Sequence, residues 1–268
     1  MSVRVSVIVA ARNEERRIGA CVSSLLGVLG ENDEVIVIND GSTDRTREVV
    51  LDFEDSRVRL LDNPESRGRG ASRNFGIANS KGKFIAIQDA DDVALPGRIE
   101  VPLALLESDA STVAASGQCI AVTKRGVYWR HHFYPLQSTD IADDFSRSRM
   151  AVCHTGSLIR RSALDEVGLY DTGLVRAQDL ELFKRLAVHG PIRNSASDVV
   201  LYTHDAWLSW KYWRTSRRYH DVIAGRAGLP LPALVGRYLV AMLRRQARKF
   251  ATSQSARDAY HAVVGDRS

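Results

Sequence analysis

Short runs of apolar, β-branched residues alternate with segments of helical periodicity through the first part of the chain, and this alternation constrains the fold more than any other feature. The predicted strands are Val3–Ala10, Glu34–Ile38, Val58–Leu61 and Lys83–Gln88. The predicted helices are Glu14–Gly27, Thr43–Phe53, Ala71–Ser80 and Pro96–Leu106. Strands separated by helices need crossover connections, which give a mostly parallel sheet with helices on its faces. The predicted fold class is therefore α/β, with a Rossmann-like, mostly parallel central sheet flanked by helices.

The remainder of the chain is less regular. The patterns predict strands at Thr112–Thr123, Gly126–Tyr134 and His154–Ile159 and helices at Asp140–Met150 and Leu180–His189. After a break near His204 the sequence is typical of helix and carries many Lys and Arg residues. We therefore predict one domain over residues 1–204, followed by a helical, basic C-terminal extension over residues 205–268.

Composition indicates an ordinary globular protein, with 44% hydrophobic and 26% charged residues and a net charge of +5. Three widely spaced cysteines fit neither a disulfide framework nor a cysteine zinc site. No apolar run is long enough for a membrane span or a signal peptide, so we predict a cytoplasmic protein. The segment Leu229–Leu243 and the basic residues after it could lie on the inner face of a membrane, or form a solvated face. The tail aromatics match no known nucleic-acid module, and no nucleic-acid partner is predicted.

Three carboxylates within four residues follow the fourth predicted strand, in the stretch Asp89-Ala90-Asp91-Asp92. Like charges this close repel each other, and burial at a strand end adds a desolvation cost. A divalent cation with oxygen ligands would relieve both penalties, and it could stabilise a departing diphosphate. The alternative is a solvated acidic turn before a helix, where the helix dipole favours carboxylates.

Polar loops also follow the first two predicted strands, at Ala11–Glu14 and Asn39–Asp44. The carboxyl ends of parallel strands meet at one edge of a sheet, where ligands bind, so these loops should converge with the acidic stretch. Asp40 could accept a hydrogen bond from a nucleobase or a ribose, although the same loop could be plain helix-capping chemistry. The Gly- and Arg-rich stretch Arg67–Asn74 leads into a predicted helix and could hold phosphate.

Two further side chains are candidates for chemistry. Asp179 lies at the start of a predicted helix, where a carboxylate could act as a general base or cap the helix. His204 could contact a metal or a phosphate, or could be structural.

The order of these motifs resembles that of the family 2 glycosyltransferases over about residues 3–205. The matching stretches are Val5–Val9, Arg12–Glu15, Asn39–Asp44, Ala71–Ala78, Gly82–Ile85, Asp89–Asp92, Gly156–Arg161, Val167–Asp171 and Gln178–Leu182. Each motif is loose, but their joint order and spacing are specific. The resemblance implies the GT-A fold, with a donor half over about residues 1–110 and an acceptor half over about 111–204.

The resemblance also implies an activity and a set of site residues. The activity is transfer of a single sugar from a nucleotide-diphospho-sugar, expected to be a UDP-sugar, to the hydroxyl of a saccharide or glycolipid acceptor. Inversion is expected, as is a place in cell-surface polysaccharide or glycolipid synthesis. Asp179 matches the catalytic base, and Mg²⁺ or Mn²⁺ would be held by Asp91, Asp92 and His204. The implied nucleotide-binding residues are Ala10, Arg12, Glu14, Asp40, Arg73 and Asp91.

The chain departs from the family pattern in places. Ala10-Ala11-Arg12-Asn13 stands where many relatives have Pro-x-Tyr-Asn, so Arg12 would stack on the base in place of an aromatic ring. The Gln-x-x-Arg-Trp signature of processive synthases is absent, which favours single addition. Two other classes stay open: a sugar nucleotidylyltransferase, although Ala11–Glu14 lacks its glycine-rich loop, and a non-catalytic nucleotide-sugar binding protein.

Overall fold

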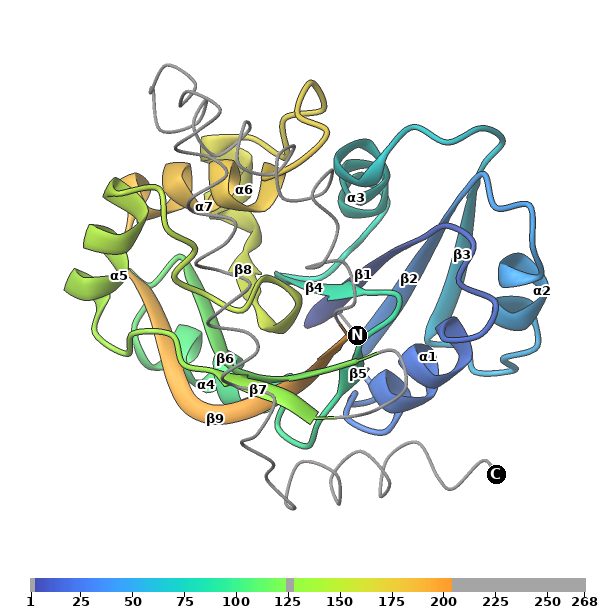
Figure 1. Cartoon of the computed structure of the whole chain (residues 1–268), viewed down its shortest axis with the longest axis horizontal. Coiled ribbons are helices and arrows are strands. Elements are labelled where there is room, and N and C mark those ends of the chain that lie inside the picture. The colour runs from blue at the N-terminus through green and yellow to red at the C-terminus, as the bar shows by residue number, and fades with distance from the viewer. Residues whose placement is uncertain (1–2, 124–127, 204–268) are drawn as a thin grey trace, which may run out of the picture.

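A single curled sheet runs through the computed structural model, which describes residues 3–123 and 128–203 (Figure 1). The strand order is β3-β2-β1-β4-β8-β6-β9-β5, and β7 pairs with β6 outside this path. The strands are β1 (Val5–Ala11), β2 (Asp33–Asp40), β3 (Val58–Asn63), β4 (Phe84–Asp89), β5 (Val93–Ala94), β6 (Ala114–Val122), β7 (Tyr128–His132), β8 (Leu158–Arg160) and β9 (Ile192–Thr203). The helices are α1 (Ile18–Leu26), α2 (Thr46–Leu51), α3 (Arg69–Ala78), α4 (Glu100–Ser108), α5 (Ser138–Ser146), α6 (Arg161–Val167) and α7 (Gln178–His189), with a 3₁₀ turn η1 (His154–Gly156).

The predicted α/β class is confirmed, because β3, β2, β1 and β4 are parallel neighbours joined through helices. Strands of this kind are covered on both faces, which explains their near-continuous apolar sequences. Three elements were not predicted: β5, α6 and β9. The segment predicted as a strand at His154–Ile159 instead contains η1 and the start of β8.

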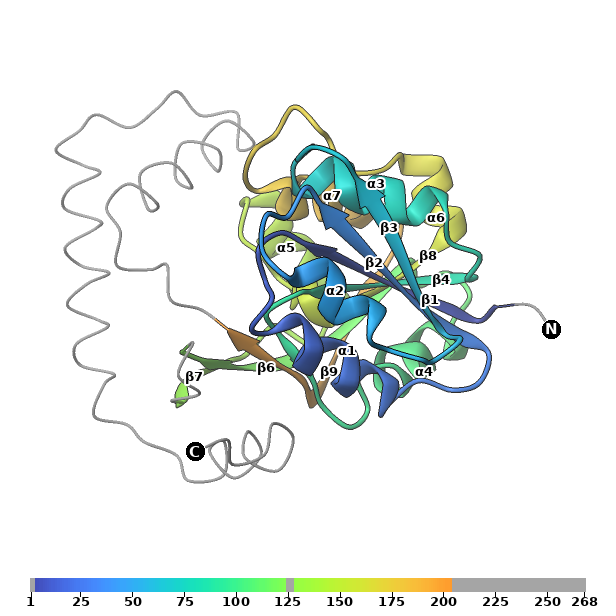
Figure 2. The ribbon, with the colours of Figure 1, turned by 90° about the vertical axis from the view of Figure 1, so that its right-hand side faces the viewer.

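Helices cover the two faces of the sheet, and Figure 2 shows α3, α6 and α7 on one side with α1 and α4 on the other. On the α1 side, Val5, Val7 and Val9 belong to one buried cluster. On the α3 side, Ile8 and Ile38 belong to a second cluster. Gly76 allows α3 to approach the sheet closely, since a Cβ there would lie 2.5 Å from Ile38 Cδ1 and 2.9 Å from Ile8 Cγ2.

The second half of the sheet curls back toward the first. β9 runs parallel to β6, and the register between them shifts twice near Gln118. β9 then continues as a long curved strand (Figure 1), and its far end pairs with β5 through Val93 and Leu201. Because β5 follows β4 after only three residues, this pairing brings the end of β9 to the acidic stretch at the end of β4.

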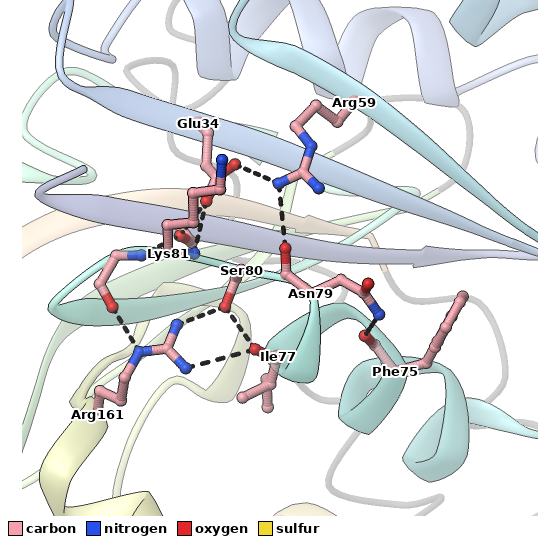
Figure 3. Close-up of polar contacts among 10 residues, drawn as sticks. Glu34, Arg59, Phe75, Ile77, Asn79, Ser80, Lys81 and Arg161 are labelled. Carbon is pink, nitrogen blue, oxygen red and sulfur yellow. Dashed lines mark hydrogen bonds and ion pairs between the residues drawn. The ribbon is translucent and has the colours of Figure 1, made fainter. Parts of the chain in front are cut away.

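A polar cluster fixes the opposite edge of the sheet, at the amino ends of the parallel strands (Figure 3). Glu34 is 6% exposed and accepts hydrogen bonds from Ser6 Oγ (2.7 Å), the Lys81 backbone N–H (2.9 Å) and Arg59 Nη1 (2.7 Å). These bonds outweigh the cost of burial and hold the pKa of Glu34 below its usual value. The cluster therefore anchors the turn between α3 and β4 to the first two strands.

Replacing Arg161 with methionine should destabilise the fold by about 2–3 kcal/mol, because hydrogen bonds that involve a charged group are worth about 1.5–3 kcal/mol each. Arg161 reaches the same turn from α6, and it donates from Nε to the Gly82 carbonyl (2.7 Å) and from Nη2 to Ser80 Oγ (2.5 Å) (Figure 3). Urea unfolding measures the change. Lys81→Met is the matched control, because Lys81 is a cation in the same turn whose side chain is exposed. This substitution should change the free energy of unfolding by less than about 0.5 kcal/mol. Equal effects of the two substitutions would contradict this role of Arg161.

None of the helices in the described part of the chain is both long and apolar enough to cross a membrane. The predicted boundary at His204 and the basic extension over residues 205–268 lie outside the described residues.

Candidate active site

The loops after β1, β2 and β4 converge at one edge of the sheet, as expected for parallel strands. In the register of the sheet, Ala10 lies beside Asp89 of β4, and Ala11 lies beside Asn39 of β2. The first two loops are also bound to each other, since the Asn13 N–H donates to Ser42 Oγ (3.1 Å) and Asn13 Oδ1 accepts from the backbone of the Asn39–Asp44 loop. Asn13 has a φ of 56°, a left-handed conformation that Asn adopts more readily than most residues.

Asp40, at the end of β2, organises the loop that leads into α3. Its side chain accepts four hydrogen bonds, from Asn63 Nδ2 (3.0 Å), Ser66 Oγ (2.8 Å) and the backbone N–H groups of Arg67 (2.8 Å) and Gly68 (3.1 Å). Burial opposes ionisation, but these donors outweigh it and hold the pKa of Asp40 below its usual value. A carboxylate has about four acceptor positions, so a contact with a nucleobase would replace one of these donors.

Arg73 of α3 forms an ion pair with Asp89, the last residue of β4. Arg73 Nη2 lies 2.7 Å from Asp89 Oδ1, and the two side chains are 7% and 31% exposed. Burial disfavours both charges, yet their attraction lowers the pKa of Asp89 and raises that of Arg73. Sequence reasoning did not assign Asp89 to the site. Its position as the last residue of a buried strand, two residues before Asp91, is the signal that would have found it.

Asp91 and Asp92 are neighbours in sequence but differ in environment. Asp91 is partly exposed, and burial together with the nearby carboxylates of Asp89 and Glu14 raises its pKa to about 6. Asp92 is fully buried, and its Oδ1 accepts a hydrogen bond from the Thr203 N–H (2.7 Å) at the end of β9. Burial raises the pKa of Asp92 well above its usual value. Through this bond Asp92 joins β9 to the acidic turn, and its assignment as a metal ligand stays a prediction.

The donor set at this turn suits a divalent cation only in part. Within residues 3–123 and 128–203, no group of three or more His, Cys, Asp or Glu side chains could hold a metal. Mg²⁺ commonly takes only one or two protein carboxylates and completes its shell with phosphate oxygens and water. Asp89 and Asp91 supply such a pair, and a cation would relieve both causes of the raised pKa of Asp91, its burial and the repulsion from Asp89 and Glu14. His204, the third predicted ligand, lies outside the described residues.

Asp179 lies in the first turn of α7, beside the first turn of α3. The two helix ends meet closely, because a Cβ on Gly70 would lie 3.8 Å from Gln178 Cγ. Asp179 is partly exposed, its Oδ1 accepts a hydrogen bond from the Leu180 N–H (2.9 Å), and its charge helps to raise the pKa of Arg73. The structure therefore brings the predicted base into electrostatic contact with the ion pair at the end of β4.

His154 and Tyr170 complete this region, and sequence reasoning missed both. His154 Nε2 lies 2.9 Å from the Tyr170 hydroxyl, and the Arg73 guanidinium lies 5.5 Å from the centre of the Tyr170 ring. Burial, reinforced by the positive charge of Arg73, lowers the pKa of His154 to about 4, so the imidazole is neutral at pH 7. Asn74 of α3 forms two hydrogen bonds with the backbone of Tyr170. Its Nδ2 donates to the Tyr170 carbonyl (2.8 Å), and its Oδ1 accepts from the Tyr170 N–H (3.0 Å). These bonds fasten the segment before α7 to α3.

The remaining predicted nucleotide residues lie around the β1 loop. Arg12 is exposed, and Glu14 is partly exposed and forms an ion pair with Arg17 at 2.6 Å. Through its effect on the Asp91 pKa, Glu14 is the member of this loop that the structure connects to the acidic turn.

Comparison with known proteins identifies the family of this fold and site. The family model described as glycosyl transferase family 2 matches residues 6–168. The chain is 37% identical over 102 residues to the UDP-Glc:alpha-D-GlcNAc-diphosphoundecaprenol beta-1,3-glucosyltransferase WfgD of Escherichia coli, covering 38% of this chain and 40% of that protein. It is 29% identical over 214 residues to an uncharacterized glycosyltransferase of Haemophilus influenzae, covering 74% of this chain and 64% of that protein. The chain thus spans less than two thirds of the length of either relative.

Solved structures agree in fold. S. aureus TarS 1–349 in complex with UDP-GlcNAc is 17% identical with a TM-score of 0.63, covering 98% of this chain and 80% of that one. The mannosyltransferase PcManGT of Pyrobaculum calidifontis, solved with GDP-Man and Mn²⁺, is 18% identical with a TM-score of 0.62, covering 98% and 74%. At these identities the likeness establishes the GT-A fold alone. The family match covers more than half of the chain, so the protein belongs to the family 2 glycosyltransferases.

Proposed function

We propose that this chain transfers a single sugar from a UDP-sugar to the hydroxyl of a saccharide or glycolipid acceptor, with inversion at the anomeric carbon. The observation that carries the proposal is the meeting of three groups at one edge of the sheet: the Asp89–Asp91 turn, Arg73 and Asp179. The names of relatives support the substrate class, since one is a UDP-Glc transferase and one neighbour was solved with UDP-GlcNAc.

The donor would bind to the half of the domain over about residues 1–110. Ala10, Arg12, Glu14, Asp40, Arg73 and Asp91 would line the nucleotide site. Asp91, together with Asp89, would hold Mg²⁺ or Mn²⁺, and the cation would neutralise charge on the leaving diphosphate. Arg73 is held rigidly by Asp89 and Tyr170, so its guanidinium is pre-oriented beside that turn.

Asp179 would act on the acceptor, which would bind to the half over about residues 111–204. Its carboxylate takes the proton from the acceptor hydroxyl while that oxygen forms a bond to the anomeric carbon. The bond from the anomeric carbon to the diphosphate breaks, and the nucleoside diphosphate leaves with the electron pair. One oxygen of Asp179 is used by the Leu180 N–H, and the other has no hydrogen-bond partner within the described ranges, which leaves it available for this step.

The acceptor and location follow from the same proposal. The acceptor in the name of the E. coli relative is a lipid-linked diphosphate sugar, which supports a glycolipid or polysaccharide intermediate here. A cytoplasmic enzyme with a basic extension over residues 205–268 would be attracted to the anionic inner face of a membrane. This extension lies outside the described residues, and no nucleic-acid partner is proposed.

The first experiment is a thermal-shift screen of the full chain with UDP, GDP and CDP, each with and without Mn²⁺. UDP with Mn²⁺ at about 100 times its Kd should stabilise the folded state by about 2.7 kcal/mol. That corresponds to a rise in Tm of roughly 5–10 °C for a domain of this size. A larger shift with GDP would contradict the base assignment alone, and no shift with any nucleotide would contradict the proposed function. Hydrolysis of a UDP-sugar with Mn²⁺ would then distinguish an enzyme from a binding protein.

A further inference from the structure

Among the residues that the structure describes, Arg98 is the largest completely buried side chain, and it binds the two residues that precede the acidic turn. It precedes α4, and its guanidinium donates from Nε to Gln88 Oε1 (3.0 Å) and from Nη2 to the carbonyls of Ile87 (2.7 Å) and Ser157 (3.4 Å). Ile87 and Gln88 are the two residues of β4 immediately before Asp89. Arg98 therefore holds the end of β4, and through Ser157 it ties that end to the segment before β8.

This arrangement is costly for the fold. Burying a cation without an opposite charge against it is strongly unfavourable, and Arg98 forms no salt bridge with any described residue. Burial lowers the pKa of Arg98 to about 10. In addition, Arg98 Nη1, Gln88 Nε2 and Asp92 Oδ2 are buried and lack a hydrogen-bond partner among the described residues. The three hydrogen bonds of Arg98 offset part of this cost, but they leave Nη1 without a partner and the charge unpaired among the described residues.

The charge of Arg98 instead complements the turn above it. Three carboxylates, Asp89, Asp91 and Asp92, lie within four residues, and Arg73 neutralises only the first through a direct ion pair. The charge of Arg98 interacts first with the thiols of Cys153 and Cys21 and then with the carboxylate of Asp92, the member of the turn that is fully buried. A fixed positive charge beneath the turn offsets part of the repulsion among the carboxylates. It also attracts any ligand whose net charge is negative, such as a nucleoside diphosphate that carries one divalent cation.

We propose that Arg98 is a positioning residue for the proposed nucleotide-diphosphate site, which it serves from below without touching the ligand. Its hydrogen bonds fix the backbone before Asp89, so that Asp89 and Asp91 keep one orientation. Its charge holds the turn together before the donor arrives. This inference rests on the proposed function, because it assigns Arg98 to the site at which UDP and the cation would bind.

The test is the Kd of UDP with saturating Mn²⁺, measured by titration calorimetry on the full chain for the wild type, Arg98→Met and Arg98→Lys. Each measurement is made well below the Tm of the variant, so that only folded protein is compared. We expect Arg98→Met to weaken binding at least about tenfold. Arg98→Lys keeps the charge but loses the fork of donors, and it should weaken binding by a smaller factor.

Arg160→Met is the matched control. Arg160 also donates to backbone carbonyls, those of Leu106 (2.8 Å) and Thr112 (3.2 Å), but it pairs with Phe84 at the other end of β4. Its replacement should lower the Tm and leave the Kd unchanged. If Arg98→Met does not fold, Arg98→Lys decides the question. A folded Arg98 variant with the Kd of the wild type overturns the proposal, as does an equal loss of affinity in Arg160→Met. Failure of the wild type to bind UDP with Mn²⁺ counts against the proposed function instead.

Discussion

Asp179→Asn should lower kcat for sugar transfer by a factor of roughly 10²–10⁴, the range that a positioned general base contributes. Asparagine has nearly the same shape and can still accept the Leu180 N–H bond that Asp179 Oδ1 accepts now, but it cannot take a proton from the acceptor. The Kd for UDP with Mn²⁺ should stay within about twofold, because Asp179 is proposed to act on the acceptor and not on the nucleotide. Single-turnover transfer and calorimetry measure the two quantities separately.

A nearby carboxylate provides the control for this variant. Asp171 lies in the segment before α7, is exposed, and accepts a hydrogen bond from the Gly173 N–H (2.8 Å). Asp171→Asn should leave kcat near that of the wild type. Near-normal turnover by Asp179→Asn would show that another group removes the proton.

Asp91→Asn should have the second large effect, and it acts in opposite directions on binding and stability. Loss of a carboxylate ligand should weaken Mn²⁺-dependent UDP binding by roughly two orders of magnitude, a change of about 2.7 kcal/mol.

The apo form of the Asp91→Asn variant should become more stable than the apo wild type at pH 7.5. The pKa of Asp91 is raised to about 6 in the folded state, so the folded chain binds this proton more tightly than the unfolded chain does. The stability that protonation provides is complete below about pH 4 and is lost as the pH rises through 6.

Removing the charge should therefore recover on the order of 2 kcal/mol at neutral pH. Urea unfolding of apo protein at pH 5 and pH 7.5, beside calorimetric titration with UDP and Mn²⁺, separates the two effects. Asp92→Asn is the informative comparison, since Asp92 is buried and bound to the Thr203 N–H. If Asp92→Asn abolishes Mn²⁺-dependent binding while Asp91→Asn preserves it, the two carboxylates have been assigned the wrong roles.

The strands β1, β2 and β4 were predictable from local patterns because they are buried on both faces. Val5–Ala11 is one such strand: six of its seven residues are buried, and the apolar run is visible without any partner. β9 could not be predicted in this way, since Asn194, Ser195 and Ser197 give it the composition of a loop. It is a strand because β6 and β5 pair with it, and no local pattern carries that information. The curl of the sheet was unpredictable for the same reason.

The candidate site, like the fold, has features that local sequence patterns predict and features that depend on distant residues. The sequence located the acidic turn and Asp179, but not the difference in burial between Asp91 and Asp92. That difference depends on a residue of β9, and the bonds between Asn74 and Tyr170 likewise join positions 96 residues apart. Arg98 gave no signal at all, because an arginine after Pro96-Gly97 is typical of an exposed turn. Its importance appears only once its surroundings are known.

The hydrogen bond from Thr203 to Asp92 joins residues 111 positions apart, and this separation sets the order in which the protein can mature on the ribosome. Synthesis proceeds from the N-terminus, and early segments fold before later ones are made. The nascent chain presents its acidic turn without the strand that completes it until nearly all of the described fold has been translated. The acidic turn therefore reaches its final hydrogen-bonded environment only after the end of β9 has been synthesised.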